Sequence, residues 1–135
     1  VSVFVENTVG RLADLTKILT DNNIDLKAST IAETVDFGIL RCIVEDPEKT
    51  VRILVENGFS ASISEVTGVS LEDKPGGLHK VLAVLAEAGI AVNYIYSTIK
   101  SAEGKAIIMM KTSDAAKAEE VLKASGVELA GADSF

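Results

Sequence analysis

The 135-residue chain contains the same segment twice. Residues 6–12 (ENTVGRL) match residues 72–78 (EDKPGGL) at an offset of 66, which is 76 − 10 for the glycine that both segments share. Further pairs at this offset are Leu15 with Val81, Leu19 with Leu85, Ile24 with Ile90, Leu26 with Val92 and Gly38 with Gly104. The offset then grows by two, so that Leu54 matches Leu122 and Gly58 matches Gly126. We therefore predict a duplication with a two-residue insertion near Ser113.

Each copy carries the same predicted order of strands and helices. β-Branched stretches bounded by turns predict strands at 1–6, 24–32, 38–45 and 60–65, and again at 66–71, 90–99, 105–111 and 128–132. Polar turns are expected at 33–36 and 101–104. Apolar residues at helical spacing predict a helix after Gly10 and another after Gly76. Asn22-Asn23 and Gly89 should end these helices, because they tolerate a positive φ.

A second helix is expected in each copy. It should start at Asp46-Pro47 and at Ser113-Asp114, and run to Gly58 and to Gly126. Each copy is therefore predicted to be β-α-β-β-α-β, the ferredoxin-like α+β arrangement with an antiparallel sheet and both helices on one face.

The two predicted domains are residues 1–66 and 67–135. A unit of about 65 residues buries only a modest fraction of its surface, and its open sheet edge invites another strand. We therefore expect the two repeats to pair side by side and to share one continuous sheet. Because no linker separates them, the last strand of the first repeat is expected to run into the first strand of the second.

Charge and composition exclude several classes of partner. The net charge is −7, from 13 basic and 20 acidic residues, which argues against nucleic acid and anionic membrane surfaces. No apolar run reaches the roughly 18 residues of a membrane-spanning helix, and no signal peptide is visible. The single cysteine, Cys42, excludes an internal disulfide and fits a cytoplasmic location. Because Val1 already lies in a predicted strand, we expect that a few residues precede it in the natural protein.

The duplicated segment resembles the ACT domain family. The pattern of that family is a strand, an Asn or Asp, often a Pro, a Gly, and a helix that opens with Leu, followed by a strand that begins like Gly-Ile-Asn-Ile. The first copy matches it at residues 6–12 and 23–26, and the second copy at 73–78 and 88–93. More narrowly, the chain is similar to stand-alone tandem ACT proteins that bind amino acids.

The resemblance implies that a small ligand, an amino acid, lies between paired domains. It would contact the first strand–helix loop of one domain and the second strand of the other. The loop residues of this chain are Asn7, Val9, Gly10, Arg11 and Leu12 in one copy and Asp73, Pro75, Gly76, Gly77 and Leu78 in the other. The facing strand residues are Asp25, Leu26 and Lys27, and Ala91, Val92 and Asn93. Val9 replaces the usual Pro and Ala91 replaces a common polar residue, so the two sites need not be equivalent.

Elementary chemistry supports an amino acid at these loops. The first turn of a helix has unpaired N–H groups and a partial positive charge, and glycine lets an anion approach them closely. Asn7 offers a donor and an acceptor, and Asp73 accepts from an ammonium group. The alternative is that Asn7 and Asp73 only shape the turn or cap the helix. Arg11 is expected either to steady a carboxylate or to be solvated.

The remaining candidate residues have structural interpretations. His79 lacks the second histidine or cysteine that a metal site requires, and we expect it at the surface. Cys42 alternates with Leu40 and Val44, which predicts a core position, and Met109-Met110 are interpreted as strand core. Tyr94 and Tyr96 share one strand face, where they line the ligand cleft or cover the sheet.

We therefore expect a regulatory binding module with no catalytic residue, cofactor or metal. The sequence shows no phosphate-binding loop or paired-carboxylate motif, and it lacks the arginine-bearing loop of the acylphosphatases. The alternative is a regulatory subunit that acts mainly by contact with an enzyme of amino-acid metabolism in trans, similar to the small subunit of acetolactate synthase. Ile39 and Ile43 beside Arg41 would then form the docking face. A homodimer is a further expected partner.

Overall fold

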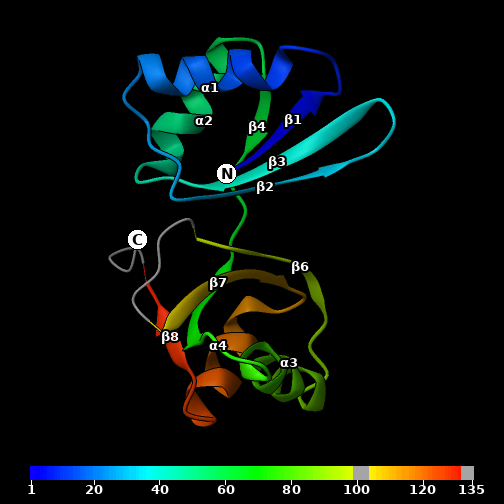
Figure 1. Ribbon diagram of the computed structural model, residues 1–135, viewed down its shortest axis with the longest axis vertical. Helices are drawn as coiled ribbons and strands as arrows, with labels where there is room; N and C mark the ends of the chain where they lie inside the picture. Colours follow the sequence, from blue (N-terminus) through cyan, green and yellow to red (C-terminus); the bar gives the residue numbers. More distant parts are fainter. Residues whose placement is uncertain (99–103, 132–135) are drawn as a thin grey trace. The chain divides into compact units, whose positions relative to one another are not determined.

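A computed structural model describes residues 1–98 and 104–131 of the chain. It confirms the predicted α+β class, because β-α-β-β-α-β occurs twice (Figure 1). The chain divides into two compact units, Val1–Ser64 and Glu65–Phe135. The first contains β1 (Ser2–Glu6), α1 (Arg11–Asp21), β2 (Ala28–Glu33), β3 (Phe37–Ile43), α2 (Pro47–Glu56) and β4 (Ser60–Ser62). The second contains β5 (Thr67–Glu72), α3 (Gly77–Glu87), β6 (Val92–Ser97), β7 (Lys105–Thr112), α4 (Ala115–Ala124) and β8 (Glu128–Ala130).

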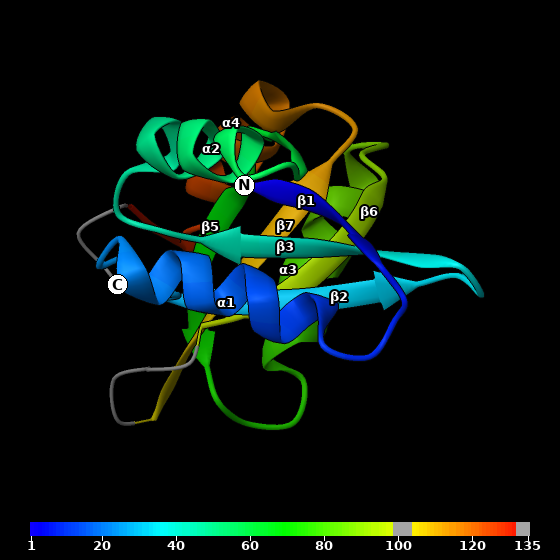
Figure 2. The same ribbon diagram turned by 90° about the horizontal axis from the view of Figure 1, so that it is seen from above.

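In the first repeat an antiparallel sheet of order β2-β3-β1-β4 carries both helices on one face (Figure 2). Alternate residues of β1 and β3 point toward α1 and α2. Val3 and Leu40, which pair across the ladder, are both buried on this face. Leu15 and Leu19 of α1 and Leu54 of α2 complete this core. The spacing of four between Leu15 and Leu19 is what a helix needs to present one apolar stripe to a sheet.

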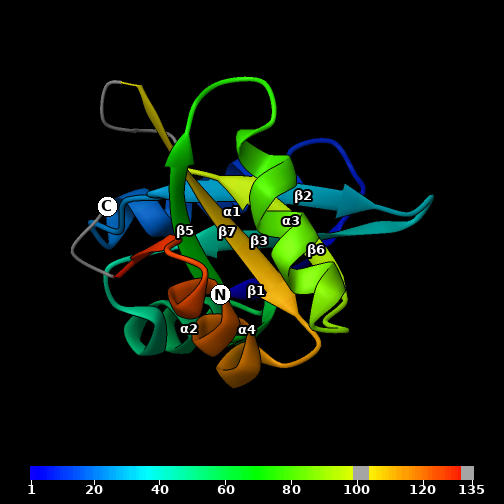
Figure 3. The ribbon, with the colours of Figure 1, turned by 90° about the horizontal axis from the view of Figure 1, so that it is seen from below.

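The second repeat has the same topology, with sheet order β6-β7-β5-β8 and helices α3 and α4 over one face (Figure 3). Its core is built from Val69, Val81, Leu85, Met110 and Leu122, all essentially inaccessible to solvent. These residues are mostly aliphatic, as the low aromatic content of the chain requires.

The helix ends follow the predicted signals. Asp46 and Asp114 are the N-caps of α2 and α4, and the carboxylate of each accepts a hydrogen bond from the backbone N–H three residues on. Pro47 occupies the first position of α2. Asn23, with φ 56°, and Gly89, with φ 72°, lie just beyond α1 and α3 in the left-handed region.

Several of the predicted strands are shorter than expected, most of all the second strand of each repeat. β2 begins at Ala28 and not at Ile24, because Ile24–Leu26 have no strand partner among the described residues and Lys27 makes a single N–H bond to the Ile43 carbonyl. β6 covers Val92–Ser97. The predicted residues 99 and 132 and the turn segment 101–103 lie outside the described residues.

The last strand of the first repeat does not run into the second repeat. β4 ends at Ser62, because its ladder with β1 stops there, and β5 begins at Thr67. Residues 63–66 between them adopt no strand. Among the described residues, the strand ladders close within each repeat and form two separate four-stranded sheets.

The two-residue insertion lies earlier than predicted. Val3 pairs with Leu40 whereas Val69 pairs with Ile108, so the offset is 66 on β5 but already 68 on β7 (69 − 3 and 108 − 40). Ile31 on β2 pairs with Leu40, and Ser97 on β6 pairs with Ile108, the equivalent of Leu40. Ser97 is therefore the equivalent of Ile31, and the offset on β6 is still 66. The insertion therefore falls between Ser97 and β7, and the sequence match of Gly38 with Gly104 was a coincidence.

No helix among the described residues is long and apolar enough to cross a membrane.

Candidate functional site

The β1–α1 loop of the first repeat is held to the β2–β3 turn by Asn7. Its backbone N–H donates to the carbonyl of Asp36 at 3.0 Å, and its side-chain Nδ2 donates to the carbonyl of Val35 at 3.3 Å. Asn7 thus ties its loop to the β2–β3 turn and does not cap α1. Its side-chain oxygen makes no hydrogen bond within the described residues and faces solvent with the exposed side chain.

Helix α1 starts at this loop without a side-chain cap. Gly10 adopts φ 85°, a left-handed conformation that L side chains rarely take, and supplies no capping oxygen. The N–H of Arg11 donates to Thr8 and that of Asp14 donates to Gly10, both on carbonyl oxygens. The N–H groups of Leu12 and Ala13 make no hydrogen bond within the described residues and lie on an exposed turn. Val9, in place of the usual proline, is fully exposed.

The β5–α3 loop of the second repeat has the same backbone. The N–H of Asp73 donates to the Gly104 carbonyl at 3.0 Å, and Gly76 adopts φ 89° without a capping side chain. The N–H groups of Leu78 and His79 are again without a partner among the described residues. Both loops are therefore built to leave two helix N–H groups open, although Pro75 replaces Val9 and Gly77 replaces Arg11.

Gly77 is required by close packing. A Cβ atom at this position would collide with the backbone carbonyl of Glu72, so the loop of the second repeat folds tightly over its own strand end. Glu72 also forms an ion pair with Lys74, and the hydrogen bond and positive charge of Lys74 lower the pKa of the Glu72 carboxyl.

The N-termini of the four helices fall into two classes. Asp46 and Asp114 cap α2 and α4, and their carboxylates occupy the N–H groups there. At α1 and α3 a left-handed glycine takes the N-cap position and the N–H groups stay open. A ligand carboxylate would meet two open donors and a partial positive charge at α1 and α3, but a carboxylate already in place at α2 and α4.

The second group of predicted site residues lies elsewhere in each repeat. Asp25 and Leu26 follow α1 whereas the loop precedes it, and an 11-residue helix separates the two ends by about 16 Å. Ala91, Val92 and Asn93 follow α3, also of 11 residues, in the same way. The structure therefore does not bring the loop residues and these residues together within one repeat. Asp25 and Leu26 also precede β2 instead of lying on it, and Asn93 sits at a β-bulge of β6.

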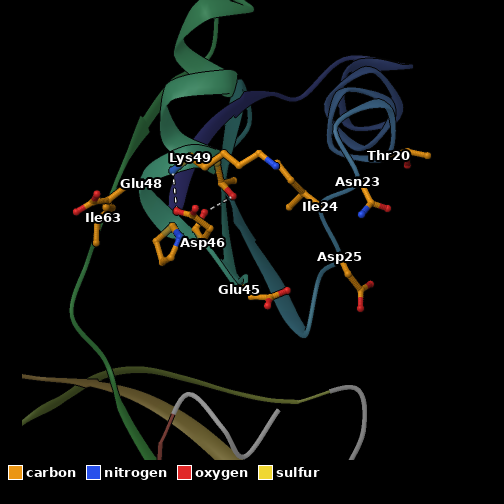
Figure 4. A pocket seen from close by; sticks show the side chains of 11 residues that line it. Thr20, Asn23, Ile24, Asp25, Glu45, Asp46, Glu48, Lys49 and Ile63 are labelled. Carbon is orange, nitrogen blue, oxygen red and sulfur yellow. Dashed lines mark hydrogen bonds between the residues drawn. The ribbon is translucent and has the colours of Figure 1, made fainter.

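Asp25 instead lines a broad hollow of about 1020 Å³ in the first repeat (Figure 4). Its walls come from the end of α1, the residues before β2 and the start of α2, with Lys49 extending from α2 toward Ile24. The charged lining residues are Asp25, Glu45, Asp46, Glu48 and Lys49. Four carboxylates against one ammonium make this hollow unfavourable for the carboxylate of an amino acid, and Asp25 is already paired with Lys27 at 3.0 Å.

Arg11 is neither free nor solvated as a long surface side chain. It is half-buried, and its guanidinium carbon lies 3.9 Å from the centroid of the Phe59 ring. Arg11 and Phe59 line a smaller pocket of about 320 Å³ together with Phe4, Glu6, Asp36, Phe37, Gly58 and Ser60. The three phenylalanines were not among the site residues predicted from the sequence. The alternation of β1 and its pairing with β3 bring Phe4 and Phe37 to one face of the sheet.

The other candidates have structural positions. His79 is exposed on α3, and no group of three or more metal-ligating side chains occurs among the described residues. Cys42 is buried, as predicted, and so are Met109 and Met110. Tyr94 and Tyr96 stack with ring centroids 6.2 Å apart. Ile39, Arg41 and Ile43 are half-buried, so the docking face expected there is less exposed than predicted.

The fold and its two glycine loops define a duplicated ferredoxin-like module with an open helix N-terminus in each copy. The family model of the ACT domain pair matches residues 1–133. The chain belongs to the ACT domain pair family.

Solved structures show the same architecture. The chain is 41% identical to protein BT0572 from Bacteroides thetaiotaomicron, with a TM-score of 0.91 over 98% of this chain and 91% of that one. It is similar in fold to the regulatory subunit of aspartate kinase from Thermus thermophilus in its ligand-free form, with 14% identity and a TM-score of 0.67 over 93% and 89% of the two chains. Comparison with curated proteins gave no match.

Proposed function

We propose that this chain is a non-catalytic regulatory module that binds an α-amino acid at the glycine loops before α1 and α3. The observation that carries the proposal is the repeated open N-terminus. In both copies of the fold, a left-handed glycine leaves two helix N–H groups without a partner among the described residues. The other two helices of the same fold have an Asp in the equivalent place.

The chemistry of the loops suits a zwitterion. Two N–H groups at the positive end of a helix bind a carboxylate. The side-chain oxygen of Asn7 and the carboxylate of Asp73, both exposed and without a partner among the described residues, accept from an ammonium group. Membership of the ACT domain pair family favours the same class of ligand.

Three finer parts of the proposal go further. The duplication puts the repeat boundaries at 1–66 and 67–135, and the family resemblance adds Asp25, Leu26, Ala91, Val92 and Asn93 to the ligand-binding residues. The chain has no enzymatic activity of its own. Regulation would follow because an amino acid that binds one conformation better shifts the population toward it.

Thermal unfolding with each of the twenty amino acids tests this function. A ligand at about 100 times its Kd stabilises the folded state by roughly 2.7 kcal/mol. Calorimetry would then measure the affinity of each amino acid that raises the unfolding temperature. The double variant Asn7→Ala, Asp73→Ala should weaken the affinity, whereas Glu87→Ala, an exposed change at the far end of α3, should not. A flat response to all twenty amino acids would refute the proposal.

A second candidate function is regulation of a separate enzyme by direct contact. Val9 and Val35 are large apolar residues that are almost fully exposed, and the Asn7–Val35 hydrogen bond joins the two loops that carry them. Exposed apolar side chains on neighbouring loops favour a protein contact. Affinity purification of the wild-type chain and of a Val9→Ser, Val35→Ser variant would test it. A stoichiometric enzyme recovered only with the wild type supports the contact.

A further inference from the structure

Three of the four phenylalanines of the chain line one pocket of the first repeat. Phe4 projects from β1, Phe37 from the start of β3, and Phe59 from the residues between α2 and β4. The rings of Phe4 and Phe37 are 4.9 Å apart at an interplanar angle of 35°. Phe59 is buried, but Phe4 is 50% and Phe37 38% exposed. In a chain with 4% aromatic residues, an open pair of rings beside a pocket of about 320 Å³ is a concentrated apolar surface.

Charged groups of both signs surround these rings. Arg11 stacks over Phe59, which fixes its guanidinium and leaves the N–H edge available to an acceptor. Glu6 and Asp36 line the same pocket. Among the described residues, none of these three side chains forms an ion pair. A fixed guanidinium that leaves two nearby carboxylates unpaired is arranged for a ligand that carries both charges.

The second repeat lacks this chemistry at the same positions. With the offset of 66 before β7 and 68 from β7 onward, Phe4 corresponds to Ser70, Phe37 to Lys105, and Phe59 to Val127. Arg11 corresponds to Gly77. The strand registers agree, because Glu6 pairs with Phe37 where Glu72 pairs with Lys105. Lys105 there lies 3.5 Å from Glu128, so an ion pair occupies the place of the aromatic surface.

We infer that this pocket, formed by Phe4, Arg11, Phe37 and Phe59, is a side-chain specificity site for one α-amino acid with a large apolar side chain. The inference rests on the proposed function and adds the ligand class, the repeat that selects it and a stoichiometry of one such site per chain. The rings of Phe4 and Phe37 receive the apolar side chain, and Arg11 binds the carboxylate. Glu6 and Asp36 add acceptors for the ammonium group to the side-chain oxygen of Asn7.

The position of Arg11 connects this pocket to the open helix end. Arg11 is the first residue of α1, and the open N–H groups belong to Leu12 and Ala13 in the same turn. Arg11 therefore lines the pocket from the same helical turn that carries the open N–H groups, whereas its equivalent Gly77 has no side chain. A volume of about 320 Å³ is at the small end of the range for ligand pockets, which suits an amino acid.

Calorimetry of the full chain tests the inference, with L-phenylalanine, L-leucine, L-aspartate and L-lysine as probes. We expect L-phenylalanine or L-leucine to bind at one site per chain and the two charged amino acids to bind at least tenfold more weakly. Phe37→Ala should weaken the apolar ligand by about tenfold or more, and Arg11→Ala by about 10- to 100-fold. Lys105→Ala, the equivalent of Phe37→Ala in the second repeat, should leave the affinity unchanged. The milder Phe4→Leu variant repeats the test if Phe37→Ala unfolds.

The outcomes separate this inference from the proposed function. If an amino acid binds with equal affinity to the wild type and to folded Phe37→Ala and Phe4→Leu variants, the pocket is not the site, although the chain is still an amino-acid-binding module. Preferred binding of L-aspartate or L-lysine leads to the same conclusion. If none of the twenty amino acids binds, both the inference and the proposed function are wrong.

Discussion

The guanidinium carbon of Arg11 lies 3.9 Å from the centroid of the Phe59 ring, at the junction of α1 and the residues that lead into β4. Phe59 is 4% exposed and belongs to the core of the first repeat, so the ring is a rigid platform. The stacking joins the core to the charged edge of the pocket, and a change in Phe59 should therefore affect both stability and the orientation of Arg11.

Phe59→Leu should lower the free energy of unfolding by about 1–2 kcal/mol, because it leaves a small cavity and removes the ring face. Urea unfolding of Phe59→Leu, Arg11→Gln and the double variant forms a cycle that isolates the cation–ring contact, which we expect to contribute about 0.5–1 kcal/mol. A coupling energy of zero would mean that the stacking is only a packing contact.

The N-caps of α2 and α4 should be equally important to stability. Asp46 accepts from the Lys49 N–H, and Asp114 from the Lys117 N–H, each at 3.0 Å. Asp46→Ala and Asp114→Ala should each cost about 1 kcal/mol in urea unfolding. Asp46→Asn and Asp114→Asn keep an accepting oxygen and should retain most of the stability. Equal losses with Ala and Asn would indicate that the charge, and not the hydrogen bond, stabilises the helix.

Gly77→Ala should destabilise the second repeat more than Arg11→Ala destabilises the first. The added Cβ would collide with the Glu72 carbonyl, and overpacking of this kind costs about 1–3 kcal/mol. At the equivalent position 11 a Cβ is already present, so Arg11→Ala loses only the contacts of the side chain. Urea unfolding monitored by circular dichroism compares the two variants, and similar midpoints would show that the Glu72 backbone moves away at little cost.

Much of the fold was predictable because the signals are local. These signals are a glycine before a helix, an Asp or Asp-Pro at a helix start, and leucines spaced four residues apart. Each involves only a few neighbouring residues, and each occurs in both repeats. The start of β2 at Ala28 was not predictable, because Ile24 and Leu26 are apolar and their exclusion from the ladder depends on where β3 ends. The insertion before β7 was misplaced because Gly104 happens to match Gly38 in the sequence, while the strand register matches Gly38 with Ala106.

The candidate site was predictable only in part. The resemblance selected the loops, and each loop has the open helix end that the sequence implied. The phenylalanine pocket was not predicted, because Phe4, Phe37 and Phe59 are 55 residues apart from first to last (59 − 4) and come together only through the β3-β1-β4 order of the sheet. The alternation within a strand can be recognised in a single sequence, but the identity of the neighbouring strand cannot.

Cys42 should be protected from thiol reagents and should make stability depend on alkaline pH. It is 1% exposed in β3, and burial raises the pKa of its thiol. The thiolate is the reactive form, so labelling with an aromatic disulfide at pH 8 should be slow in the native protein and rapid in urea.

Above about pH 8.5, the ordinary thiol pKa, the unfolded chain loses the Cys42 thiol proton while the folded chain keeps it. The folded state therefore loses stability as pH rises from there toward the raised pKa. Cys42→Ala should remove this part of the pH dependence, and an identical alkaline slope in the variant and the wild type would show that other groups cause it.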